Sequence, residues 1–451
     1  MQTLTDPPAT LRKSLKLRHI VILGLGYMTP TTVFDTYGIV TDTTSGHVPA
    51  AYIVTLIAIL FTAACYGHMV RAFPVAGSAY TYSRTAINPH VGFMVGWIAL
   101  LDYIFLPMIN VLLTRIYLEA AFPGVPGWIW IVVMAGLLTV VNLWSNNVVA
   151  NLNTFLVFFQ ILVVSIFSVL VIQRLTADPA DSAAFTLTPF FSPDMSMGAL
   201  LGGAAILCFS FLGFDAVTTY AEETPDPRKT IPRAIYLVAA MGGLIFITAG
   251  YLASLLFPDV SQFSDPESAS PEMAFILGGS LFQSIFLAGA LSSTIASGIA
   301  SHMSASRLLF AMGRENVLPK KWFGYVSPRF QTPMINVLLI GAFSLTALAL
   351  DLATAIQFIN FGALTAFTAV NLSVIGYYYI QQKQRGLAGT LKYVVVPLVG
   401  TSFIAFLWSN LEMPSLILGF VWSGLGLIYL LVNTRMFSRK PPVMDYYEEA
   451  I

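Results

Sequence analysis

The feature that most constrains this chain is a series of apolar runs, each about 20 residues long, that follow one another from residue 19 to residue 433. A helix that crosses a bilayer needs about 20 mostly apolar residues, whereas the helices of soluble domains keep a polar face. Only 10% of the residues are charged, compared with about 25% in soluble domains. The sequence therefore predicts an all-α integral membrane protein.

Twelve segments are long and apolar enough to span the membrane. We expect these helices at 19–40, 50–70, 91–118, 126–144, 150–173, 198–221, 233–257, 274–303, 333–350, 354–380, 391–409 and 414–433. The first run is too long for the apolar core of a cleaved signal peptide, so it is expected to remain as helix 1. No loop is long enough to form a separate domain, and residues 1–451 are predicted to form a single domain.

The basic residues check this helix count independently, because Lys and Arg accumulate in cytoplasmic loops. With a cytoplasmic N-terminus, all but Arg115 and Arg174 of the 22 Lys and Arg residues fall on the cytoplasmic side. The outer loops are instead acidic, and they carry Asp178, Asp181, Asp194, Asp259, Asp265, Glu267 and Glu272. A wrong count would disrupt this alternation, so we expect twelve helices with both termini in the cytoplasm.

Motifs for other classes of activity are absent from the sequence. It contains no G-x-x-x-x-G-K-S/T phosphate loop, no H-E-x-x-H motif and no Cys/His cluster with metal-ligand spacing. Cys65 and Cys208 lie in apolar runs and are predicted to be small core residues. The net charge of zero gives no basic field for nucleic acid. We therefore expect no enzymatic activity, no cofactor, no metal and no nucleic-acid partner.

Three carboxylates lie within predicted membrane helices: Asp35 in helix 1, Asp102 in helix 3 and Asp215 in helix 6. A charge near the bilayer centre costs several kcal/mol, so such a residue is a candidate functional group. No Lys or Arg within the membrane is expected to face these carboxylates, so their natural counter-charge is a visiting proton, metal ion or ammonium group. Structural alternatives remain open: Asp35 would cap a broken helix, and Asp102 would form a hydrogen bond within the bundle.

Helices 1 and 6 are both predicted to be interrupted. Helix 1 contains Gly24, Gly26, Pro30 and several threonines at mid-depth, and helix 6 contains Gly213 directly before Phe214 and Asp215. Irregular backbone at this depth is tolerated only where it lines a cavity or is buried in protein. Interruptions at corresponding places in two halves indicate a transporter binding site. Glu222 and Glu223 end helix 6, where a salt bridge to Arg228 or Lys229 is an alternative role, and the preferred one for Glu223.

Several motifs resemble the amino acid–polyamine–organocation transporter family over nearly the whole chain. They are FPVAGSAYTY (73–82), GFMVGW (92–97), FSFLGFDAVTTYAEETPDPRKTIPRAI (209–235) and SRLLFAMGRENVLP (306–319). Within that family, TPTTVFDTYGIV (29–40), GHVPA (46–50), INPHVGFMVGW (87–97) and LLDYIFLPMIN (100–110) are similar to bacterial putrescine importers.

The resemblance implies a fold and an activity. The fold is a five-plus-five inverted-repeat (LeuT-like) core with broken helices 1 and 6, in which residues 19–173 and 198–380 form the repeats and residues 391–433 form two extra helices. The activity is proton-driven import of putrescine or a related small organic amine across the inner membrane of a bacterium. Amino-acid-carrying members usually have G-S-G-I-F at the helix 1 break, whereas this chain has Pro30-Thr31-Thr32-Val33-Phe34. One backbone N–H is lost and Asp35 follows, which favours a cationic substrate over a carboxylate.

The resemblance also implies roles for individual residues. Asp215 is expected to contact one ammonium group, with Asp35 or Glu222 as the second acceptor, while Tyr103 lines the pocket and the adjacent Asp102 points to another face. The remaining substrate-site candidates are Thr31, Phe209 and Phe214, the two phenylalanines as an aromatic lid or as ordinary packing. Many sodium-independent members carry a lysine where Gln160 aligns, so the coupling ion must use another group. The candidates are Glu222, Asp35, Ser293, Thr294 and Ser297.

Other functions remain open at this point. An exchanger of amine against amino acid would need a carboxylate site at helix 1. An importer of monoamines such as tyramine, or of cationic amino acids, would use the same aromatic and acidic groups. A sensor without transport is disfavoured because the short termini offer no signalling domain.

Overall fold

The computed structural model describes residues 15–438, apart from 75–77, 145–147, 178–184, 315–317 and 328–331, together with residue 441. Some residues named above lie outside this part of the chain, either entirely or in their side chains. They are Asp178 and Asp181, and the side chains of Glu222 and Glu223.

Every predicted membrane segment corresponds to helical structure, and the described residues contain no strand. In chain order the elements are α1 (Leu17–Met28), α2 (Thr32–Asp35), α3 (Tyr37–Thr44), α4 (Val48–Ala72), α5 (Ser78–Ala86), α6 (Pro89–Ala121), α7 (Gly127–Trp144), α8 (Val148–Ala177), α9 (Met197–Leu207), η2 (Cys208–Phe211), η3 (Ala216–Glu223), α10 (Pro227–Leu256), η4 (Val260–Gln262), η5 (Pro266–Ser268), α11 (Ala269–Arg314), α12 (Lys320–Phe323), α13 (Met334–Ser344), η6 (Leu345–Leu348), α14 (Leu352–Val374), η7 (Ile375–Gln381), α15 (Leu387–Thr390), η8 (Leu391–Val395), α16 (Val396–Trp408) and α17 (Met413–Asn433).

Length and composition identify the membrane spans. Within the described residues, nine helices are long and apolar enough to cross a bilayer, and two shorter apolar helices, Gly127–Leu143 and Met334–Leu348, accompany them. The segment from α1 to α3 completes the predicted set, because its break divides it into pieces that are each too short to span alone. The chain is therefore a multi-pass, all-α membrane protein.

Helices 1 and 6 are interrupted as predicted. Helix 1 stops at Thr29, which has a positive φ of 50°, and Pro30 follows in a turn before α2 begins. Helix 6 leaves its α-helical course at η2, and residues 212–215 form a turn before η3. Proline removes a backbone donor and glycine adopts positive φ without strain. Pro30 therefore accounts for the break in helix 1, and Gly213, with its positive φ, accounts for the break in helix 6.

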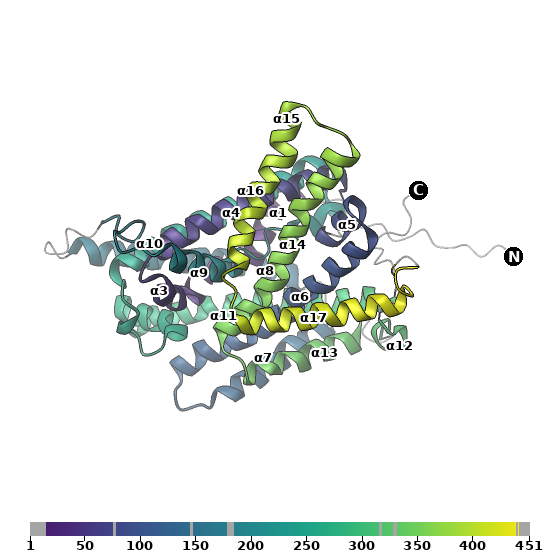
Figure 1. Cartoon of the computed structure of the whole chain (residues 1–451). Helices are drawn as coiled ribbons and strands as arrows, with labels where there is room; N and C mark the ends of the chain where they lie inside the picture. Colours follow the sequence, from purple (N-terminus) through teal and green to yellow (C-terminus); the bar gives the residue numbers. More distant parts are fainter. Residues whose placement is uncertain are drawn as a thin grey trace.

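The helices pack as a bundle around α6, with α11 and α14 along it and α4 packed against α10 (Figure 1). Small residues allow these close contacts, as is usual between membrane helices. A methyl group added at Gly24 of α1 would come within 2.6 Å of Val238 of α10. Figure 1 also shows α14 and α16 forming a hairpin that projects beyond the rest of the bundle, with α15 at its tip.

Two elements differ from the predicted bounds. The segment expected at 274–303 extends over Ala269–Arg314 and is kinked at Gly278 and Gly279, because Gly279 has a φ of 62°. The helix expected at 354–380 ends in a π-helical stretch, Ile375–Gln381. Apolar periodicity predicts where a helix lies in the bilayer, but it does not detect a helix that continues into the polar region.

Candidate functional site

Asp215 lies at the break of helix 6, immediately before η3. Gly213 two residues earlier has a φ of 109°, and a Cβ atom at that position would lie 2.4 Å from Cδ1 of Tyr27. The break therefore brings helix 6 into direct contact with helix 1. The Asp215 backbone carbonyl accepts hydrogen bonds from Thr218, at 2.9 Å from N and 2.7 Å from Oγ1.

Asp215 and Asp102 are close enough to interact electrostatically, although they lie on different helices. The Tyr66 hydroxyl donates a long hydrogen bond of 3.5 Å to Oδ2 of Asp215. Both carboxylates are only partly buried. Neither forms a salt bridge with a Lys or Arg of the described residues. Two neighbouring carboxylates thus lack a permanent positive partner here.

Tyrosines surround this pair of carboxylates. Tyr27 of α1 lies close enough to Asp102, Asp215 and Tyr103 to interact with each of them. Asp102 and Tyr103 are adjacent on α6 and both lie within electrostatic range of Tyr27, and the expectation that they point to different faces of the helix stays a prediction. Tyr103 also packs against a small apolar cluster that contains Ala305 and Ile340.

Asp35 lies in a different environment. It is the last residue of α2, it is only 7% exposed, and it accepts a hydrogen bond from the hydroxyl of Tyr117. Asp35 makes no side-chain cap to α3, so the capping alternative is not what the structure shows. Tyr117 is 15 residues beyond Asp102 on α6, which corresponds to about 22 Å of helix. Asp35 therefore contacts α6 about four turns beyond Asp102.

A small cavity lies beside the break of helix 1. Its volume is about 20 Å³, which is enough for roughly one water molecule. The lining residues come from the broken first membrane helix (α1 and α2), from α6, from the break after α9 and from α11. They are Tyr27, Met28, Thr29, Thr32, Asp35, Leu106, Asn110, Leu113, Phe209, Leu212, Ser293 and Ser297. In this conformation the helices close tightly at the level of the breaks.

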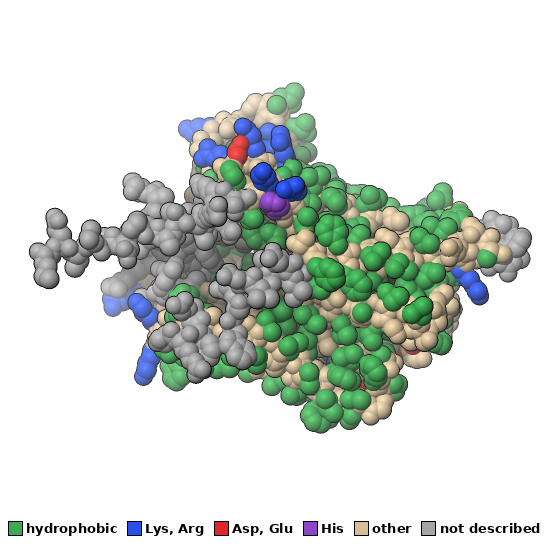
Figure 2. Space-filling model, turned by 180° about the vertical axis from the view of Figure 1, so that it is seen from behind, with side chains coloured by type: hydrophobic (Ala, Val, Ile, Leu, Met, Phe, Trp, Pro, Cys, Tyr) green, Lys and Arg blue, Asp and Glu red, His purple; other side chains and the backbone are tan. Residues whose placement is uncertain are grey.

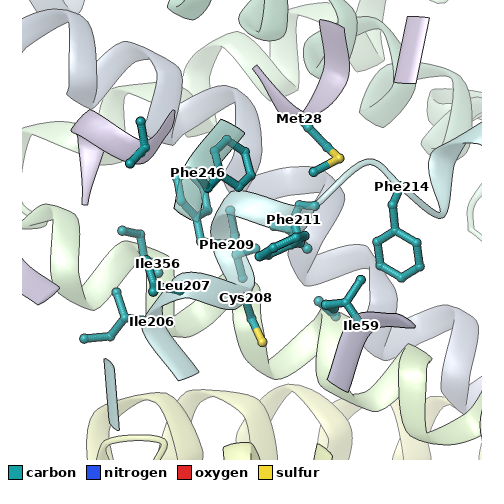
Figure 3. Close-up of a cluster of buried hydrophobic side chains, with 14 of the residues drawn as sticks. Met28, Ile59, Ile206, Leu207, Cys208, Phe209, Phe211, Phe214, Phe246 and Ile356 are labelled. Atoms are coloured by element: carbon teal, nitrogen blue, oxygen red, sulfur yellow. The ribbon is translucent and has the colours of Figure 1, made fainter. Parts of the chain in front are cut away.

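The two phenylalanines predicted as a lid have different positions (Figure 3). Phe209 lines the small cavity. Phe214 is fully buried and packs against Tyr66 and Phe367, with ring centroids 5.7 and 5.3 Å away. Ordinary helix packing therefore accounts for Phe214 in this conformation, while Phe209 remains a candidate wall of the site.

Hydroxyl groups of α11 connect to α6 next to the cavity. Asn110 Nδ2 donates to Ser297 Oγ at 3.1 Å, and Thr114 Oγ1 donates to Thr294 Oγ1 at 3.0 Å. Ser293 and Ser297 line the cavity, whereas Thr294 is used for helix pairing. No group of three His, Cys, Asp or Glu residues with metal-binding geometry occurs among the described side chains.

Three other residues identified from the sequence complete the description. The Thr31 hydroxyl, beside the helix 1 break, is buried and has no hydrogen-bond partner in the part of the chain that the structure describes. Gln160 is fully buried, and neither atom of its amide has a partner among the described groups. The backbone of Glu222 lies in η3, but its side chain belongs to the part that the structure does not describe. The assignments of these residues to substrate or ion stay predictions.

A larger cleft opens at the end of the bundle where α6 ends and α14 begins. Its volume is about 530 Å³, and its lining includes Glu119, Asp265, Glu267 and Asp351, together with Arg115. Arg115 pairs with Glu119 at 3.0 Å. The remaining acidic groups give this end of the molecule a negative lining.

Sequence reasoning missed the tyrosines that contact the carboxylates, Tyr27, Tyr66 and Tyr117, and the amide of Asn110. Asn110 had a detectable signal, because a polar amide in the middle of an apolar helix usually has a partner. The tyrosines had none, since tyrosine is common in membrane helices and only the tertiary packing places these hydroxyls beside Asp215 and Asp35.

Comparison with known proteins identifies the family of this chain. The amino acid permease family model matches residues 19–436. The low-affinity putrescine importer PlaP of Escherichia coli strain K12 is 46% identical over 441 residues, which cover 98% of this chain and 97% of that protein. The branched-chain amino acid permease BcaP of Bacillus subtilis strain 168 is 25% identical over 468 residues, covering 96% of each chain. Human cationic amino acid transporter 4 is 26% identical over 398 residues, covering 81% of this chain and 60% of that protein. The chain belongs to the amino acid permease family.

Proposed function

We propose that this protein imports putrescine, or a closely related small organic amine, across the inner membrane of a bacterium, driven by the proton gradient. The observation that carries the proposal is the pair of carboxylates, Asp102 and Asp215, which interact with each other and form no salt bridge with the described Lys and Arg residues. Two like charges at one site favour a ligand with two positive charges. The relative named as a putrescine importer supports this choice of cargo.

The dimensions of the ligand favour this pair over a pair that includes Asp35. Five bonds of about 1.5 Å separate the two nitrogens of putrescine, so they lie roughly 6 Å apart when the chain is extended. Asp35 is bonded to Tyr117, about 22 Å along α6 from Asp102. Asp35 thus meets α6 about four turns from Asp102, so we assign substrate to Asp102 and Asp215 and the coupling proton to Asp35.

The helix 1 break supports an amine over an amino acid. A bound carboxylate would need exposed backbone N–H groups at this break. The N–H of Thr32 already donates to the carbonyl of Thr29 at 3.0 Å, and that of Phe34 donates to the carbonyl of Thr31 at 2.9 Å. Pro30 has no N–H to offer. The acidic cleft at the opposite end from the basic loops also favours the approach of cations.

Uptake of radiolabelled putrescine by the Asp215→Asn variant tests the proposal. A hydrogen bond to a charged group is worth about 1.5–3 kcal/mol, so uptake at low substrate concentration should fall about 10- to 100-fold. Glu412→Gln, which removes an exposed carboxylate before α17, is the matched control and should leave uptake unchanged. Normal uptake by Asp215→Asn, with equal amounts of protein in the membrane, would refute the assignment.

Competing amines distinguish the proposed cargo from its alternatives. The Asp102→Asn variant should lose its preference for a diamine, so that butylamine competes as well as putrescine. Strong competition by tyramine in the unaltered protein would instead favour a monoamine importer. Stimulation of uptake by internal ornithine or lysine in proteoliposomes would favour an exchanger.

A further inference from the structure

Three basic residues from three separate elements surround one aromatic group at the basic end of the bundle. Arg71 ends α4, Arg228 begins α10 and Lys392 lies in η8. His68 lies within electrostatic range of Arg71 and Lys392, and Tyr378 lies within range of Arg71 and Arg228. The hydrogen bond from the Tyr378 hydroxyl to the carbonyl of His68 and the packing of α10 on α4 bring these elements together, so three cations that the sequence separates by up to 321 residues gather at one place.

The aromatic group itself has a defined arrangement. The rings of Tyr378 and Tyr393 stack with centroids 4.4 Å apart and planes 5° apart, and His68 lies edge-on to Tyr393 at 5.3 Å. The Tyr378 hydroxyl donates to the carbonyl of His68 at 2.9 Å, which ties the projecting hairpin to α4. Lys392 Nζ lies 5.4 Å from the centroid of the Tyr393 ring. We name Arg71, Arg228 and Lys392 the cationic patch.

No Asp or Glu in the described part of the chain forms an ion pair with the cationic patch. All three side chains are exposed, and none forms a salt bridge with a described Asp or Glu. Asp226, which precedes α10, pairs with Lys229 at 3.4 Å. Figure 2 shows Lys and Arg side chains gathered around a histidine near the projecting end of the molecule, with few acidic side chains among them. Among the side chains that the structure describes, the patch therefore carries net positive charge.

The surroundings of the patch are those of a membrane interface. Tyrosines concentrate at the level of the lipid headgroups. Tyr236, which is 38% exposed on α10, lies within electrostatic range of Arg71. Apolar side chains continue from the patch along the hairpin, where Leu391 is 59% exposed and Leu398 is 48% exposed. A ligand here would meet cations at one end and apolar surface at the other.

We propose that the cationic patch binds the headgroup of an anionic phospholipid, whose phosphate lies among Arg71, Arg228 and Lys392 while its acyl chains follow the exposed face of α16. Basic pockets between membrane helices on the cytoplasmic side suit such headgroups. The bound lipid would join α4 and α10 to the α14–α16 hairpin. This inference does not depend on the transported substrate.

Native mass spectrometry of the purified full-length chain tests the proposal, with phosphatidylglycerol and phosphatidylcholine as probes. The unaltered protein should retain phosphatidylglycerol in preference to phosphatidylcholine. Each basic residue near a membrane surface contributes about a fivefold effect, so the triple variant R71Q/R228Q/K392Q should bind phosphatidylglycerol on the order of 100-fold more weakly. The matched triple variant R307Q/K320Q/K321Q, which removes exposed cations of α11 and α12, should bind it normally.

Each outcome decides the matter. Equal loss of phosphatidylglycerol binding in both triple variants would mean that overall charge attracts the lipid. Full retention of phosphatidylglycerol by R71Q/R228Q/K392Q would mean that the lipid binds elsewhere. Either result overturns the proposal. Competition by soluble glycerol phosphate at the same concentration would identify a free anion, rather than a lipid, as the ligand. If the triple variant does not fold, the single variants should each show about a fivefold loss, and no loss in any of them would be equally decisive against it.

Discussion

At the scale of single residues, the carboxylates in the membrane divide into two kinds. Asp102 and Asp215 are partly accessible and interact with each other, whereas Asp35 is buried and bonded to Tyr117. The sequence could predict all three as candidates, because an acidic residue in an apolar run is conspicuous. It could not predict this division, since residues 35 and 117 meet only through the packing of two helices.

Asp35 provides a prediction about coupling. If it carries the transported proton, Asp35→Asn mimics the protonated form permanently. Such a variant should lose accumulation of putrescine against a gradient but retain exchange of internal for external putrescine. Transport assays in proteoliposomes with and without a pH gradient measure both. Tyr117→Phe, which removes only the hydrogen bond, should show a partial loss. Gradient-driven accumulation by Asp35→Asn would assign the proton to another group.

Gly213 provides a second prediction at this scale. Its φ of 109° and the 2.4 Å approach of Tyr27 leave no room for a side chain. Gly213→Ala should therefore cost about 1–3 kcal/mol in backbone strain alone, which should lower the thermal unfolding temperature and abolish uptake. Gly136→Ala is the matched control, because a methyl group at Gly136 meets nothing within 4 Å. Equal stability of the two variants would show that the break tolerates a side chain.

At the scale of helices, apolar run length could predict every membrane segment, and glycine and proline could predict both breaks. The ends and kinks of the helices were less predictable. The kink at Gly278 and Gly279 within α11 and the π-helix that follows α14 were not predicted from run length. The small cavity beside the breaks was also beyond prediction, since its 20 Å³ volume reflects how closely four helices approach in one conformation.

The attachment of α17 to α6 gives a prediction for elements. Trp97 Nε1 donates to the carbonyl of Trp422 at 3.0 Å, and Trp422 Nε1 donates to the carbonyl of Trp97 at 2.8 Å. The rings stack with centroids 5.1 Å apart. Trp97→Phe and Trp422→Phe should each lower thermal stability, with a coupling energy of about 0.5–3 kcal/mol in the double-mutant cycle. Trp128→Phe, at a site 57% exposed, should change little. Strict additivity would show that the reciprocal bonds are energetically independent.

At the scale of the whole molecule, the two ends of the bundle differ in charge. The cleft at one end is lined by Glu119, Asp265, Glu267 and Asp351, and the cationic patch lies among the basic residues of the other. Because basic loops remain in the cytoplasm, the acidic cleft is predicted to face outward and to attract amines before they reach the bundle. The repeat division at 19–173 and 198–380 stays a prediction that follows from the same topology.

Labelling with a membrane-impermeant thiol reagent tests this orientation without removing native cysteines, because Cys65 and Cys208 are both 0% exposed. The unaltered protein should therefore not react in intact cells. Ser261→Cys, in the loop that is predicted to be outside, should be labelled in intact cells. Lys321→Cys, in the predicted cytoplasmic loop, should be labelled only in inside-out vesicles. Both residues are exposed in the structure, so a difference between them reports the side of the membrane rather than burial. Labelling of Lys321→Cys but not of Ser261→Cys in intact cells would show the opposite orientation in the membrane. The acidic cleft would then face the cytoplasm and favour export.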